Sequence, residues 1–293
     1  MLRYTVVRTY ARVYPIQWVC KVVHVTRAGY YAWNTREPSR HAQEDQRITN
    51  EIMLRITKKR RSYGSLRVHA LLNQQGIRCG HNRVARLMRI AGVRATAQRR
   101  RFRYPAIAKT EAKVFPNLVN RQFTVHTPNT VWLTDITFIT MRSQTMYLAT
   151  VLDLYSRRIV GWKIDLTRKG IAESALQQAI LLRNPAPGLI VHSDRGSEFT
   201  SIAYANVCAT ASIRQSFSRV GNCWDNAPME RFFASLKTEM EPVSGMPYRL
   251  AYAAVADYID TFYNRERLHS TNKYCAPAVY EQQSIVSAID PTP

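Results

Sequence analysis

The sequence predicts an α/β fold, with a mixed sheet flanked by helices, preceded by an all-α helix-turn-helix-like domain. Apolar side chains recur at helical spacing between residues 39 and 95. From residue 130 onward, short runs rich in aromatic and β-branched residues alternate with helical patterns, which is typical of an α/β domain. The charge balance changes near the same place, so we expect the two parts to have different tasks.

Most of the positive charge lies in the front of the chain. The 293 residues carry a net charge of +22. Residues 1–128 contain 26 Lys/Arg and 5 Asp/Glu, whereas residues 129–293 contain 16 and 15. A basic front joined to a near-neutral back indicates a polyanion that is held by the first and processed by the second. A purely solubilising or ribosomal-type role would leave the acids of the back half unexplained.

Composition and the positions of Pro and Gly predict four regions. We expect an N-terminal helical segment at 1–38, a helix-turn-helix-like DNA-binding domain at 39–95, a basic linker at 96–128, and a core with a C-terminal helical extension at 129–285. Five unpaired cysteines suit a reducing compartment. The apolar stretch near residues 18–25 is too short and too polar for a bilayer, so we expect a cytoplasmic protein with no membrane partner.

The first two regions read as a series of helices. Two short helical patterns surround Thr26–Gly29; they fit a helix-turn-helix remnant or a helical hairpin equally well. Ser39 is a candidate N-cap for a helix that reaches about Arg61. Ser65 is a candidate cap for a second helix, 66–75, which Gly76 ends. The apolar positions of this second helix include Leu66. A third helix is expected near 82–91, with Val84, Leu87, Met88 and Ile90 as its apolar positions.

Arginines mark the expected DNA-binding surface. Arg83, Arg86 and Arg89 lie on the outer positions of the third helix, as in the reading helix of a helix-turn-helix, although any three-helix bundle has a similar pattern. In the linker, Phe102 and Tyr104 are interleaved with cations, which suits phosphate contacts and base stacking. A solvated tether has the same composition. The linker arginines are Arg99, Arg100, Arg101 and Arg103.

The back half predicts a sheet with three strands in an antiparallel meander, followed by alternating helices and strands. The expected strands are 131–140, 146–154, 158–164, 189–193 and 212–216, and the helices between the last three are 171–183 and 200–210.

Three carboxylates stand at informative places. Asp135 interrupts an apolar strand, where an unpaired charge is costly, and Asp194 follows the strand 189–193 at its carboxyl end. Glu230 lies early in a helix that Asp225 or Asn226 can cap, and Lys237 shares its face at i+7. Taken singly, these residues also fit a buried ion pair, a turn and a surface pair. Together they offer the oxygen ligands that Mg²⁺ prefers.

The spacing and the flanking words resemble insertion-sequence transposases of the retroviral-integrase-like group. The resemblance rests on Asp135, Asp194 and Glu230, with 35 residues between the last two, and on Lys237 seven residues after the glutamate. The segments 131–137, 192–197 and 263–270 match as well. One departure is Asn272-Lys273, where Leu-Gly is more usual in the family.

The resemblance implies a ribonuclease-H-like fold and DNA strand cleavage and joining that depend on Mg²⁺, with Mn²⁺ able to substitute. It implies a pair of metal ions, with Asp135 bridging both and Asp194 and Glu230 each holding one. The implied partners are DNA, as element ends and target, and further copies of the chain on that DNA, in the bacterial nucleoid. The sequence lacks a heptad zipper, so it looks like the second frame of such an element, which depends on an upstream-frame protein or fusion.

Two other readings compete with a transposase. A nuclease of the same fold would hydrolyse DNA or RNA without joining it. A regulator would bind DNA through its arginine-rich helices and need none of the three carboxylates.

Overall fold

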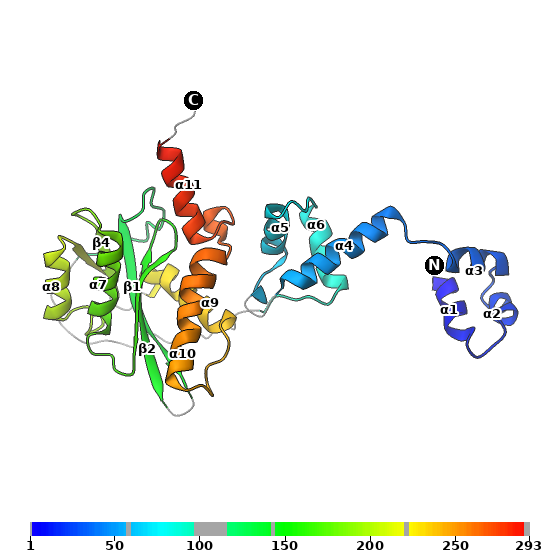
Figure 1. The fold of residues 1–293 in the computed structure, drawn as a ribbon, viewed down its shortest axis with the longest axis horizontal. Coiled ribbons are helices and arrows are strands. Elements are labelled where there is room, and N and C mark those ends of the chain that lie inside the picture. Colours follow the sequence, from blue (N-terminus) through cyan, green and yellow to red (C-terminus); the bar gives the residue numbers. More distant parts are fainter. Residues whose placement is uncertain (1, 57–59, 97–115, 142–143, 220–222, 290–293) are drawn as a thin grey trace. The chain divides into compact units, whose positions relative to one another are not determined.

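The computed structural model describes residues 2–56, 60–96, 116–141, 144–219 and 223–289 (Figure 1). The chain divides into two compact units, Met1–Glu51 and Ile52–Pro293. This division falls within a helix and differs from the four regions expected from sequence, which stay a prediction. In the described residues, no helix is both long and apolar enough to cross a membrane.

The first unit is a small helical cluster. It contains α1 (Leu2–Tyr10), α2 (Ile16–Val22), α3 (Arg27–Asn34) and most of α4 (Arg40–Arg55). Thr26 caps α3, since its Oγ1 accepts a hydrogen bond from the Gly29 amide at 3.1 Å. The two helices expected around this turn are therefore present, and α1 joins them. Their small core is formed by Val7, Val19, Cys20 and Tyr30.

Helices α4, α5 (Ser65–Gln74) and α6 (His81–Ile90) make up the helix-turn-helix-like region. Ser39 caps α4 as expected, accepting from the Ala42 amide at 3.2 Å, but the helix ends at Arg55 rather than near Arg61. Gly76 follows α5 with φ +79°, a left-handed conformation that glycine adopts without strain.

Two details of α5 and α6 differ from the sequence prediction. Gly64 occupies the N-cap of α5, while the Ser65 hydroxyl pairs with the His81 imidazole of α6 at 2.9 Å. Leu66 and Ile90, expected inside, are largely exposed. Each lies at one end of its helix, where the apolar stripe has turned away from the shared core. That core contains Val68, Leu71, Leu72, Val84, Leu87 and Met88.

A five-stranded sheet forms the centre of the second unit (Figure 1). Its strands lie in the order β3-β2-β1-β4-β5; β1 to β3 are an antiparallel meander, and β1, β4 and β5 run parallel. All five expected strands are present to within two residues. Their bounds are β1 Val131–Thr140, β2 Thr145–Asp153, β3 Ile159–Asp165, β4 Ile190–Ser193 and β5 Arg214–Phe217.

Two helices, α7 (Ile171–Arg183) and α8 (Ile202–Thr210), pack on the sheet through an apolar cluster. The cluster includes Trp132 of β1, Val151 of β2 and Leu176 of α7, all fully buried. Gly161 of β3 permits the close approach of α7, because a Cβ at this position would lie 2.3 Å from the Ala175 carbonyl oxygen. The mixed α/β class predicted from sequence is thus confirmed.

The remaining helices follow β5. They are a single turn at Cys223–Asn226, α9 (Ala227–Glu239), α10 (Tyr248–Ala256), a wide helical segment at Asp257–Glu266, a short turn at Ser270–Asn272 and α11 (Pro277–Ile289). The wide segment is tied to the sheet by Asn264, whose side-chain amide both accepts from the Ile159 N–H and donates to its carbonyl, each at 2.9 Å.

A buried ion pair joins α9 to the segment after it. The Arg267 guanidinium donates to both carboxylate oxygens of Glu239, at 2.7 and 2.8 Å, and both residues are nearly inaccessible to solvent. The Ser62 hydroxyl also donates to Glu239, and the Tyr63 hydroxyl accepts from the Leu268 amide at 2.9 Å. Residues that precede α5 are therefore built into the interior beside α9.

The local structure explains how Asn272 and Lys273 fit where Leu-Gly is more usual. Lys273 has φ +52°, the left-handed conformation that a glycine takes at least cost. Asn272 is buried, and its side-chain amide donates to the Ser156 carbonyl. The asparagine thus anchors a turn in which the lysine adopts the conformation expected of glycine.

Candidate active site

The first two acids come just after the parallel pairing of β1 with β4. Val131 pairs with Ile190, Trp132 with Val191 and Leu133 with His192. Asp135 and Asp194 each lie two residues beyond the last of these pairs, on the carboxyl side of the ladder. Asp194 is the residue after β4, at the carboxyl end of the strand, where α/β sheets place their ligands.

Asn226 lies where the parallel ladder ends. The Ile190 amide donates to the Thr130 carbonyl, so the same ladder would next use the carbonyls of residues 132 and 134. The Thr134 carbonyl instead accepts from the Asn226 side-chain amide at 3.2 Å, in a buried position. Asn226 thereby fixes the first turn of α9 to β1, next to Asp135.

Helix α9 carries the third acid and the lysine. Pro228 stands in the first turn, where proline is well tolerated, and Phe232, Phe233 and Leu236 bury one face. Glu230 and Lys237 lie on the exposed part of the helix. The Lys237 ammonium lies over the Phe138 ring of β1, 4.9 Å from its centroid, so this face of α9 lies alongside the strand that bears Asp135.

Asp225 does not cap α9, contrary to one expectation from sequence. Its fully buried carboxylate accepts from Arg121 at 2.9 Å, from the Arg219 side chain at 3.0 and 3.1 Å, and from the Asn117 amide at 2.9 Å. The hydrogen bonds from Arg219 hold the pKa of Asp225 well below its usual range. The charged Asp225 side chain therefore fixes the residues just before α9. Asn226 occupies the N-cap position, but its side chain bonds β1 and not the helix.

His192, two residues before Asp194, anchors the end of β4 through hydrogen bonds. Its ring nitrogens pair with the hydroxyls of Ser216 and Ser218 at 2.9 and 3.1 Å, and the side chain is fully buried. Burial lowers the pKa of His192 to about 4, so the imidazole is neutral near pH 7. A neutral histidine bridging β4 and β5 stiffens the strand end from which Asp194 projects.

The surroundings of Asp194 raise the pKa of its carboxyl group. Asp194 is exposed as a residue, yet dehydration by nearby protein atoms raises the pKa of its carboxyl group, and the charge of Glu198 raises it further. The Gly196 amide opposes this by donating to Oδ1 at 2.9 Å. The positive charge of Arg168, which pairs with Glu198, also lowers the pKa of Asp194.

Comparison with known proteins places these features in a family. Residues 43–102 match an HTH-like domain, and residues 125–223 and 211–277 match an integrase core domain. A transposase for insertion sequence element IS904 of Lactococcus lactis is 34% identical, covering 84% of this chain and 98% of the relative. Transposase InsF for insertion sequence IS3A of Escherichia coli is 32% identical, over 97% and 100%. The chain belongs to the insertion-sequence transposases.

Other relatives agree. An insertion element IS600 31 kDa protein of Shigella sonnei is 36% identical over 90% of this transposase and 98% of the relative. Among solved structures, the HTLV-2 integrase catalytic core domain in complex with magnesium covers 53% of this chain and 97% of its own, at 18% identity and a TM-score of 0.40. The matched domains and the transposase relatives, rather than this structure, show that the chain is an enzyme with an integrase core and an HTH-like DNA-binding domain.

The four predicted site residues are not all equally assembled. The parallel ladder of β1 and β4 ends two residues before Asp135 and Asp194. The contact between Lys237 and Phe138 sets α9, which also bears Glu230, alongside β1. Among the described residues, no three His, Cys, Asp or Glu side chains form a ready-made metal-binding group. The donor set nevertheless fits a hard divalent cation, since all three candidates are carboxylates, one of them on β1 and one directly after the neighbouring β4.

The predicted DNA-binding arginines fall into two sets. Arg86 and Arg89 are exposed on α6 and Arg83 is half-buried, within the matched HTH-like domain. Arg99, Arg100, Arg101 and Arg103 lie outside the described residues. Both assignments stay predictions.

Sequence reasoning missed the residues that hold the site together. The partners of Asn226, Asn264 and Arg267 lie 92, 105 and 28 residues away in the chain, so no local spacing identifies them. One usable signal was the adjacent pair Asp225 and Asn226, just before a helix with an apolar face.

Proposed function

We propose that this transposase cleaves one DNA strand at each end of its insertion element and joins the released end to target DNA, in a reaction that depends on Mg²⁺. The observation that supports the proposal most is that Asp135 and Asp194 each lie two residues beyond the last pair of the β1–β4 ladder, while α9 is fastened to β1. Asp135, Asp194 and Glu230 would hold the metal, which supplies positive charge to the phosphate and its attacking and leaving oxygens. A pair of ions, as the resemblance implies, belongs to this proposal.

The residues of the chain have separate parts in that reaction. Asp135 lies on β1 and Asp194 directly after β4, whereas Glu230 lies in the exposed first turn of α9 and would close on the site as DNA and metal bind. Lys237 already lies along the same edge and would hold a phosphate oxygen as a point charge. The buried network of Asp225, Asn226 and His192 keeps the framework in place.

The chemistry is two displacements at phosphorus. In the first, a water oxygen bonds to phosphorus while the bond to the 3′ oxygen breaks; water gives up a proton and the 3′ oxygen gains one. In the second, that 3′ hydroxyl bonds to a target phosphorus and a target 3′ oxygen leaves with the proton. Neither step requires a nucleophilic side chain or an external energy source.

The proposal is tested by strand-transfer assays with labelled element ends and Mg²⁺. Asp194→Asn and Glu230→Gln should abolish cleavage and joining while DNA binding in a gel-shift assay persists. Glu241→Gln, the same change at an exposed glutamate just after α9, is the matched control and should retain both steps. Either acid variant joining DNA at the wild-type rate would refute the assignment.

Products distinguish the alternatives. A nuclease would yield cleaved ends and no joined species, and a regulator would yield neither. The proposal also covers the partners: DNA, further copies of the chain on that DNA, and an upstream-frame protein or fusion that helps to recognise the ends. Sedimentation of the chain with and without element-end DNA tests the second of these.

A further inference from the structure

An apolar groove in the first unit has no part in the proposed reaction. It lies between α1 and α2, within residues 6–23. The matched HTH-like domain begins at residue 43 and the integrase core at 125, so neither accounts for it. The groove therefore calls for a separate explanation.

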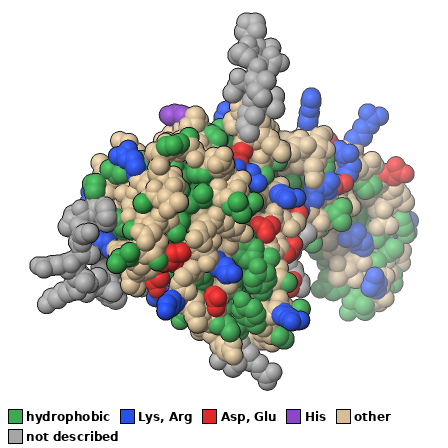
Figure 2. Space-filling model, turned by 60° about the vertical axis from the view of Figure 1, so that its left-hand side comes forward, with side chains coloured by type: hydrophobic (Ala, Val, Ile, Leu, Met, Phe, Trp, Pro, Cys, Tyr) green, Lys and Arg blue, Asp and Glu red, His purple; other side chains and the backbone are tan. Residues whose placement is uncertain are grey.

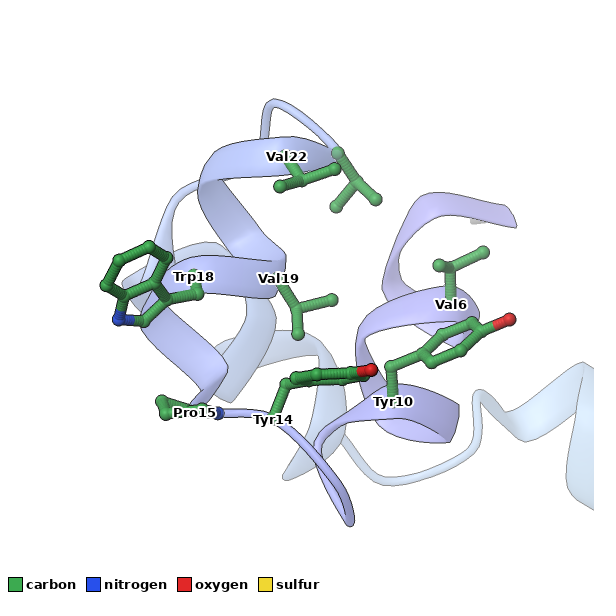
Figure 3. A pocket seen from close by; sticks show the side chains of 8 residues that line it. Val6, Tyr10, Tyr14, Pro15, Trp18, Val19 and Val22 are labelled. Carbon is green, nitrogen blue, oxygen red and sulfur yellow. The ribbon is translucent and has the colours of Figure 1, made fainter.

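The groove is a hollow with a volume of about 650 Å³. Figure 3 shows Val6 and Tyr10 of α1 across from Val19 and Val22 of α2, with Tyr14 between them at one end. Its lining is almost entirely apolar: Val6, Tyr10, Tyr14, Pro15, Trp18, Val19, Val22 and Val23.

Large apolar side chains are exposed around this hollow. Trp18 and Val22 are 67% and 75% accessible, and Tyr10 and Tyr14 are more than half accessible. Exposed apolar groups gathered in one hollow, rather than scattered singly, mark an interaction surface. The small core of the unit is already closed by Val7, Cys20 and Tyr30, so folding the unit does not require these side chains to be covered.

The rim of the groove is positively charged. Arg3 shares a helical row with Val6 and Tyr10, and Lys21 shares one with Trp18, so both project beside the lining; each is exposed. Residues 1–36 contain six Lys/Arg and no Asp or Glu. A ligand that complements this surface is apolar along one stripe and acidic on either side of it.

We propose that the groove binds an amphipathic helix of a partner protein, with an apolar stripe flanked by acidic residues. A helix laid into an apolar groove presents anchors at i, i+3, i+4 and i+7, which suits a hollow between two short helices. A second copy of this face would bring like charges together. DNA matches the charge and has no apolar stripe to fill the hollow.

The test uses the full-length chain and a designed, fluorescein-labelled peptide of about 20 residues, with leucine at helical anchor spacing and glutamate on its other faces. Fluorescence anisotropy should show saturable binding. Two comparison peptides should bind at least about tenfold more weakly: one with lysine replacing glutamate, and one with serine replacing leucine.

Variants locate the binding site. Val22→Asp should weaken peptide binding about tenfold or more, because it places a like charge in the groove. Val13→Asp is the matched control: Val13 is 72% exposed and does not line the groove, so affinity should change less than about twofold. Lys21→Glu should also weaken binding, and raised salt should do the same for the wild type. Circular dichroism checks that each variant is folded.

Four results would overturn the proposal: equal binding of the lysine peptide, equal effects of Val22→Asp and Val13→Asp, dimerisation of the chain through this face, or loss of duplex DNA binding on Val22→Asp without any peptide affinity. The last two would assign the groove to a second copy or to nucleic acid. Because no step of strand transfer is involved, the outcome is independent of the proposed reaction.

Discussion

Asn226 is the residue on which the geometry of the site most depends. Its side-chain amide holds the Thr134 carbonyl, one residue before Asp135, and it stands four residues before Glu230. Among the described residues its side-chain oxygen has no hydrogen-bond partner, so the site contains an unused buried acceptor. Such groups are costly in a folded interior unless a ligand or water satisfies them.

Replacing Asn226 by alanine should therefore affect activity more than stability. The variant loses one hydrogen bond but also removes the unpaired oxygen, so we expect it to lose less than about 1.5 kcal/mol of unfolding free energy. We expect strand joining to slow about tenfold or more, since α9 is no longer fixed to β1. Urea unfolding and single-turnover joining measure the two effects, with Mg²⁺ affinity by calorimetry as a third. Proportional losses of stability and rate would contradict a positioning role.

His192 makes the free energy of unfolding depend on pH. Its pKa is lowered to about 4 in the folded protein, against an ordinary value near 6.5, so the folded state binds fewer protons than the unfolded state between these values. Its stabilising contribution is complete above about pH 6.5 and is lost as the pH falls toward 4. A shift of this size corresponds to about 3 kcal/mol.

We expect His192→Gln to flatten this dependence. Urea unfolding at pH 7 and pH 4.5 should show the wild type losing about 2–3 kcal/mol more than the variant over that interval. The buried carboxylates titrate in both proteins, so the difference between them isolates the histidine. Equal pH slopes would show that His192 takes up a proton without disturbing Ser216 and Ser218.

At the scale of elements, the packing of α7 on the sheet depends on a missing side chain. A Cβ on Gly161 would lie 2.3 Å from the Ala175 carbonyl oxygen and 2.7 Å from the Ala179 Cβ. Gly161→Ala should push α7 away from β3 and cost about 1–3 kcal/mol. Gly245→Ala, where no atom lies within 4 Å of the added methyl group, should stay within about 0.5 kcal/mol of the wild type in the same thermal unfolding assay.

The elements themselves were largely predictable, because their signals are local. Apolar and β-branched runs marked all five strands to within two residues, and α7 was placed without error. Helix ends were harder. The α4 pattern continues through Ile56 in sequence, yet the helix stops at Arg55. Leu66 and Ile90 fit an apolar stripe but face solvent, since a helical period does not say where its partner ends.

The candidate site residues could be named from the sequence, and stay a prediction, but their arrangement could not. Asp135 and Asp194 could be aligned only through the pairing of β1 with β4, which no local pattern specifies. Asp225 looked like a helix cap because aspartate often is one; Arg121, more than a hundred residues earlier, is a stronger partner than a backbone amide. Long-range ion pairs of this kind cannot be read from spacing.

At the scale of the whole molecule, the charge is divided between the two halves. Residues 129–293 carry 16 Lys/Arg and 15 Asp/Glu, and acidic and basic side chains lie interspersed over the larger body in Figure 2. The +21 of residues 1–128 should thus supply most of the electrostatic attraction to DNA.

We therefore expect DNA affinity to fall steeply with salt, and the slope to depend on the front half. Arg86→Ala combined with Arg89→Ala should reduce the slope of log affinity against log salt by about 2, one for each lost phosphate contact. Arg265→Ala, an exposed arginine of the near-neutral half, should leave the slope unchanged. Gel shifts with element-end duplex over a salt series measure both. An unchanged slope in the double variant would move the DNA surface away from α6.

The ties from Ser62 and Tyr63 to Glu239 and Leu268 bear on how this enzyme can be cut into pieces. A fragment that starts at the sheet would lack the Tyr63 ring and leave a cavity in its place. The ion pair of Glu239 and Arg267 would then lie in that cavity. Any stand-alone catalytic fragment should accordingly begin ahead of residue 60, even though the strands start only at 131. The segment between the helices of the HTH-like domain packs into the interior beside α9 of the integrase core. A truncation placed between the two domains would therefore cut through this shared packing.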